Sequence, residues 1–155
     1  MSVRADRSRY LDSLADQVRA ADDATPVILS SIAAVCERTV APAHKAGLAR
    51  LRRLIENGAS TEAALAMIEL ELPHWKLRRL VYDQGDWHCA LSRQRELPEW
   101  LDQAVEASHR DLALAILAAF VDALQRTAGE TRIGRPSVPQ IHTDTYAPFL
   151  CENFA

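Results

Sequence analysis

The chain has few cysteines, and no two of them lie at a spacing typical of a metal or redox site. Cys36, Cys89 and Cys151 are far apart along the 155 residues. An odd number of widely separated thiols fits a reducing compartment better than an oxidising one, where small domains are usually cross-linked by disulfides. We therefore expect a cytoplasmic protein with free thiols.

Long hydrophobic runs are also missing. The longest apolar stretch, Leu112 to Leu124, is shorter than the roughly 20 residues that span a bilayer, and it contains Asp122. The first thirteen residues, MSVRADRSRYLDS, show no apolar core of a signal peptide. We expect neither a membrane span nor export.

Motifs that carry catalysis are absent from the sequence. The five glycines are scattered, so no phosphate-binding loop is predicted. No G-x-S-x-G turn, C-x-x-C pair or H-E-x-x-H pair occurs. The net charge of -3 provides no global basic field for a polyanion. We expect no cofactor, and we favour a binding protein over an enzyme.

The residues that are present indicate a soluble, mainly helical protein. Hydrophobic residues make up 48% and charged residues 25%, a balance typical of a globular domain. Apolar residues recur at helical spacing among charges, and Thr25-Pro26, Asn57-Gly58 and Pro73 provide signals for helix ends. The predicted helices cover 4–21, 26–40, the region around 48–57, 60–72 with Ser60 as its cap, 97–108, and 112–124.

The last of these helices is apolar around most of its circumference, which is typical of a helix enclosed by others. Ser108 to Asp111 resembles a capping box at its start. The fold class predicted is a mainly α domain of five to six helices, with a short β-hairpin insertion at about 77–92. Residues 1–128 form this single domain, and residues 129–155 form an irregular tail that straps onto the body or onto a partner.

The stretch KLRRLVYDQGDWHCALSR, residues 76–93, has two interpretations. As a hairpin it turns at DQGD, which pairs Tyr82 with Trp87 and Leu80 with Cys89, while Val81 and His88 share the other face. Gln84 is a poor residue for a type I′ turn, so we expect a type II turn or a bulged loop that uses Gly85.

As a helix over 74–84, the same stretch would follow helix 60–72 in the order of a winged helix-turn-helix. This alternative function, DNA binding by residues 60–92, would use four basic side chains: His74, Lys76, Arg78 and Arg79.

A third hypothesis is a metal-dependent helical enzyme. The Glu-x-x-His spacing occurs twice, in Glu71 with His74 and in Glu106 with His109, as in di-iron bundles. Pro73 interrupts the first pair. Further imidazoles are His44 and His142, whereas His88 and Cys89 would point to opposite faces of a strand. We therefore assign no metal ligand.

Aromatic residues support the primary hypothesis, an interaction or regulatory protein without catalytic activity. Large amphipathic rings are the residue types that anchor protein interfaces. The candidates are Trp75, Trp87, Trp100, Tyr146, Phe149 and Phe154. The expected partner is another protein or a second copy of this chain in a homodimer.

Overall fold

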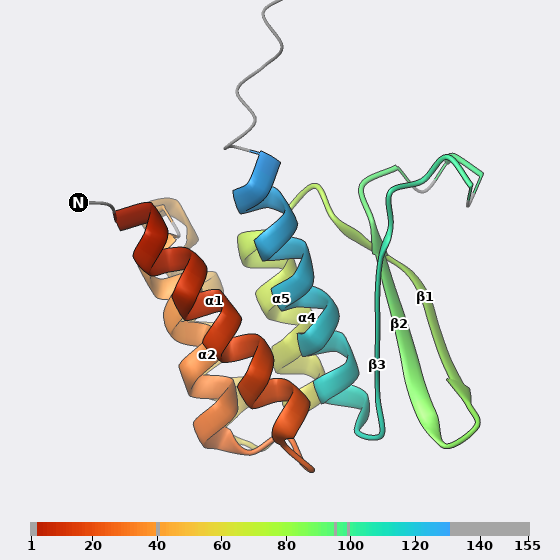
Figure 1. Ribbon diagram of the computed structural model, residues 1–155. Coiled ribbons are helices and arrows are strands. Elements are labelled where there is room, and N and C mark those ends of the chain that lie inside the picture. Colours follow the sequence, from red (N-terminus) through yellow and green to blue (C-terminus); the bar gives the residue numbers. More distant parts are fainter. Residues whose placement is uncertain (1–2, 40, 95, 99, 131–155) are drawn as a thin grey trace, which may run out of the picture.

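The computed structural model describes residues 3–39, 41–94, 96–98 and 100–130, without the side chains of residues 3 and 4. This part of the chain is mainly helical and carries one small antiparallel sheet, as predicted (Figure 1). The elements are α1 (Val3–Ala20), α2 (Pro26–Thr39), a 3-10 turn η1 (Pro42–His44), α3 (Lys45–Glu56), α4 (Ser60–Glu71), β1 (Lys76–Asp83), β2 (Asp86–Ser92), β3 (Val105–His109) and α5 (Leu112–Glu130).

Helix α5 is the centre of the fold. Ten of its residues between Ala113 and Leu124 are buried, which confirms the predicted core helix. Helices α1 and α4 pack on it, and strands β2 and β3 cover its other side (Figure 1). By length and hydropathy α5 could also cross a membrane, but more than half of it is buried inside the protein, as expected for a core helix.

Helices α1 and α2 follow their local signals. Leu11, Leu14 and Val18 form the buried face of α1. Thr25 caps α2, because its Oγ1 accepts a hydrogen bond of 3.4 Å from the amide of Ile28. Both assignments agree with the predictions.

The connection between α3 and α4 is a Schellman turn. Gly58 has φ +71, the amide of Ala59 donates to Leu54 O, and the amide of Gly58 donates to Ile55 O. The predicted cap at Ser60 is wrong: Ala59 precedes the helix, and Ser60 Oγ donates to Ala24 O instead.

The hairpin interpretation of residues 77–92 is confirmed, with the predicted register of Tyr82 opposite Trp87 and Leu80 opposite Cys89. The predicted turn type is wrong. Asp83 pairs with Asp86, so Gln84 and Gly85 alone form the loop, and their φ values of 51 and 93 are those of a type I′ turn. The strand twist imposed this geometry although Gln84 disfavours it.

The predicted helix over 97–108 is wrong. The amides of Leu101 and Asp102 donate to Pro98 O in a turn, and Val105–His109 is the third strand. This strand pairs with β2 from Trp87–His109 to Leu91–Val105. Pairing with a strand that lies earlier in the chain outweighed local helix propensity.

The start of α5 also differs from the prediction. The cap is Asp111 itself, whose Oδ1 accepts the amide of Leu114 at 2.9 Å, and no capping box begins at Ser108. The helix continues to Glu130, past the predicted domain limit at residue 128. The tail from 131 to 155 lies outside the described residues, so the strap stays a prediction.

Replacing Gln84 by Asn should stabilise the protein by about 0.5–1 kcal/mol, because Asn tolerates positive φ better than Gln. Gln84→Val should lower the free energy of unfolding instead, since a β-branched residue is strained in this conformation. Urea unfolding of the two variants measures the difference, and an Asn variant no more stable than the Val variant would contradict the turn assignment.

Candidate functional site

The three tryptophans of the predicted interaction set have different surroundings. Trp75 is 3% exposed and lies under the guanidinium of Arg93, 4.9 Å from the ring centroid. Trp87 is half-buried beside Tyr82, with 5.2 Å between ring centroids. Trp100 is 81% exposed. Of the three, Trp100 therefore has the ring most exposed to solvent.

The loop that carries Trp100 is fastened to β1 by Arg78. The pairing of β1 with β2 shifts its register between Leu77 and Arg79, so Arg78 lies at an irregularity of the strand. Its guanidinium donates to Leu97 O at 3.2 Å from both terminal nitrogens and also bonds the carboxylate of Asp102. The side chains of Arg78 and Asp102 are 18% and 2% exposed, so this ion pair is nearly enclosed. The loop is held at both of its ends.

The residues assigned to DNA binding do not form a recognition helix. His74 precedes β1, and the segment from Lys76 onward is a strand, so the helical interpretation of 74–84 is wrong. Arg78 is bonded to Asp102, and Arg79 lies 3.5 Å from Glu106 on β3. In the paired strands, Leu80 and Trp87 are half-buried and pack against the hydrophobic core.

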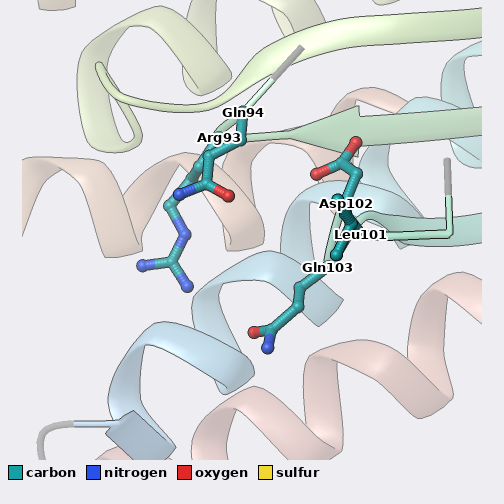
Figure 2. Close-up of a pocket in the computed structure, with 5 residues that line it drawn as sticks. All are labelled: Arg93, Gln94, Leu101, Asp102 and Gln103. Atoms are coloured by element: carbon teal, nitrogen blue, oxygen red, sulfur yellow. The ribbon is translucent and has the colours of Figure 1, made fainter. Parts of the chain in front are cut away.

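A polar hollow of about 330 Å³ lies between the end of β2 and the loop before β3. Its lining is Arg93, Gln94, Leu101, Asp102 and Gln103. Figure 2 shows the side chains of Arg93 and Gln103 reaching into the same space, while the Asp102 carboxylate points away from Gln103. This hollow adjoins the loop of Trp100.

The charges around the hollow are already compensated. Arg93 makes a two-pronged ion pair with Glu130, with one N–H···O distance of 2.8 Å. This hydrogen bonding raises the pKa of Arg93 and lowers the pKa of Glu130. Arg126 donates to Gln103 O at 2.8 Å. In the described part of the chain, no hydrogen bond engages the side-chain amides of Gln94 and Gln103, which line the hollow and can both donate and accept.

The two thiols that the structure describes are poor nucleophiles. Cys36 and Cys89 are fully buried, and burial raises the pKa of each to about 12 because the thiolate loses its hydration. An activated thiol beside His88 is therefore not formed at neutral pH.

The histidines give no metal centre among the described residues, where no group of three or more His, Cys, Asp or Glu side chains could hold an ion. His109 ends β3, and its two ring nitrogens face Ala21 O and the amide of Asp111, each at 3.0 Å. Glu106 faces Arg79. His44 is exposed, and His142 lies outside the described residues.

Glu71, the other carboxylate with metal-ligand spacing, has a structural role. Thr39 Oγ1 donates to it, and Arg7 lies 3.3 Å away. Burial raises the pKa of Glu71, and these two partners oppose the rise only in part. His74 is exposed and is not among its partners.

No local signal in the sequence pointed to the hollow or to the Arg78–Asp102 pair, because the two residues are 24 positions apart. The alternation of inward Val105, Ala107 and His109 was the one pattern that could have revealed β3.

Comparison with known proteins does not identify a family for this chain: no family model, no curated protein and no solved structure matches it.

Arg78→Ala should lower the free energy of unfolding by about 3–5 kcal/mol, because it leaves the Asp102 carboxylate buried without its partner. Arg79→Ala is the matched control, since its ion pair is exposed and worth about 0–1 kcal/mol. Chemical unfolding of both variants tests this, and equal losses would contradict the structural role of Arg78.

Glu71→Gln should remove a pH-dependent loss of stability. The folded state holds the Glu71 proton more tightly than the unfolded state, so wild-type stability falls as pH rises from about 4.5 through the raised pKa. The advantage of the variant should therefore grow over this range and then level off. Asp122, whose pKa is also raised, contributes equally to both proteins. An advantage that stays constant between pH 3.5 and 7.5 would contradict the assignment.

Proposed function

We propose that this chain is a non-catalytic interaction module that recognises a protein through the anchored loop of Trp100, described at residues 97, 98 and 100–102. The observation that carries the proposal is the 81% exposure of Trp100 on a loop fastened by an enclosed ion pair. Tryptophan is among the residues that contribute most to protein interfaces.

Exposing this ring to water is unfavourable, and a partner would recover that free energy. A large aromatic side chain buries about 150–250 Å² when it is covered. Leu101, next to it, is 48% exposed and lines the polar hollow. Leu101 shares the hollow with Gln94 and Gln103, and Trp100 precedes it in the chain. Apolar contacts surrounded by polar groups are the usual composition of an interface.

Anchoring reduces the entropic cost of recognition. A mobile loop loses conformational freedom when it binds, whereas Arg78 already restrains this loop through Leu97 O and Asp102. The expected ligand places an apolar side chain against Trp100 and a backbone amide against Gln94 or Gln103. A second copy of this chain is one such partner, in the homodimer predicted above.

The non-catalytic part of the proposal is supported by the state of the reactive groups in the described residues. Both thiols there have a strongly raised pKa, and the charges at the hollow are paired. A cytoplasmic location is proposed on the separated cysteines alone.

Trp100→Ala should weaken binding about 30-fold, the loss of about 2 kcal/mol that marks an anchor residue. Val27→Ala is the matched control, because Val27 is an apolar side chain that is 74% exposed on α2. Sedimentation velocity of the full chain measures self-association. Retention of proteins from the source cells, followed by titration of a purified partner, measures binding to other proteins.

Binding that Trp100→Ala removes and Val27→Ala preserves is the expected result. The proposal fails if the full chain stays monomeric at high concentration and no retained protein depends on Trp100.

A further inference from the structure

A second hollow, of about 530 Å³, lies between the start of α1 and the end of α2. Leu11 and Val35 form its floor, and Tyr10 forms one wall. Arg7, Arg38 and Thr39 stand at the rim together with the acidic Asp6. We call this feature the α1–α2 groove. An apolar floor under polar groups suits an amphipathic occupant.

Arg38 is the group at the rim that attracts an acidic residue, whereas Asp6 at the same rim repels one. Arg38 stacks over the ring of Tyr10 at 5.1 Å, and in the described part of the chain it has no carboxylate partner. Arg7 and Thr39 both bond the carboxylate of Glu71, whose side chain is only 8% exposed, so Arg7 is already paired. One guanidinium is therefore available above an apolar floor.

The chain itself contains a segment of matching chemistry. Residues 146–154, YAPFLCENF, combine three aromatic rings and a leucine with a single charged residue, Glu152. The basic residues of the tail, Arg132 and Arg135, precede this segment in the sequence. Pro148 limits the conformations that this segment loses on docking.

The same segment can reach the groove. Asp12 on α1 bonds Gln125 on α5, and the two helices run in opposite directions, so α5 ends where α1 begins (Figure 1). The length of α1, 18 residues, is about 27 Å. An extended chain from Glu130 to Phe149 spans up to about 60 Å. The tail is more than long enough.

We propose that residues 146–154 dock in the α1–α2 groove of their own chain, with Phe149 and Leu150 over Leu11 and Val35 and with Glu152 facing Arg38. The polar hollow beside Trp100 is the poorer site for these rings, because its charges are paired and its free groups are amides. This proposal is independent of the proposed function. It assigns Tyr146, Phe149 and Phe154 to the body of the protein rather than to a partner.

Paramagnetic relaxation enhancement in the full chain tests the proposal. A nitroxide is attached at position 155 in a Cys151→Ser, Ala155→Cys protein. Cys36 and Cys89 are buried with a pKa of about 12, so they should escape labelling. Docking should reduce the amide intensities of residues 7–11 and 35–39 to below about half, in proportion to the docked population. The hairpin turn at 83–86 should keep its intensities.

The matched control carries Phe149→Ser and Leu150→Ser with the same label, and it should lose the selective effect. Arg38→Glu should weaken the effect by repelling Glu152. Equal broadening in parent and control, or broadening centred on Gln94 and Gln103, overturns the proposal. So does broadening of unlabelled protein by labelled protein in a mixed sample, which would place the tail of a second copy in the groove.

Discussion

The burial of α5 is the constraint on which the rest of the structure depends. Its apolar residues occupy most of its circumference, so elements must cover it on nearly every side. Helices α1 and α4 supply one part of that cover, and β2 and β3 supply the other. A three-stranded sheet of this size needs such an apolar partner to be stable. The strands on either side of the candidate site, β2 and β3, therefore owe their position to α5.

Packing on α5 does not by itself determine the course of the chain between β2 and β3. Two ion pairs do so: Arg78 with Asp102 ties the loop to β1, and Arg93 with Glu130 ties its beginning to the end of α5. The first is enclosed and the second is partly exposed, so the first contributes more to the geometry. In this mildly acidic protein, the basic side chains of Arg78 and Arg93 therefore stabilise the fold. In the sequence, the cluster of Lys76, Arg78 and Arg79 resembled a nucleic-acid surface, because the carboxylates that pair with Arg78 and Arg79 are distant in the chain.

The two proposed surfaces use aromatic residues in opposite ways. Trp100 stands on a restrained loop with its ring in water, which is the arrangement of an interface anchor. The groove between α1 and α2 has an apolar floor and the guanidinium of Arg38, which has no carboxylate partner among the described residues, and this composition suits an apolar segment with one acidic residue. A chain with apolar residues at its end benefits from such cover, since large exposed patches promote unwanted association. The two surfaces can therefore operate without competing.

Local interactions determined much of this protein from its sequence alone. Apolar periodicity predicted the five helices, Thr25 and Gly58 marked two helix ends, and the alternation around DQGD predicted the hairpin register. Each of these depends on neighbours a few residues apart. Only the tertiary structure decided β3, the turn at Pro98, the exposure of Trp100 and the pairing of Arg78 with Asp102. Those features arise from contacts between segments that folding onto α5 brings together, and a short-range pattern does not specify which distant segment a residue contacts.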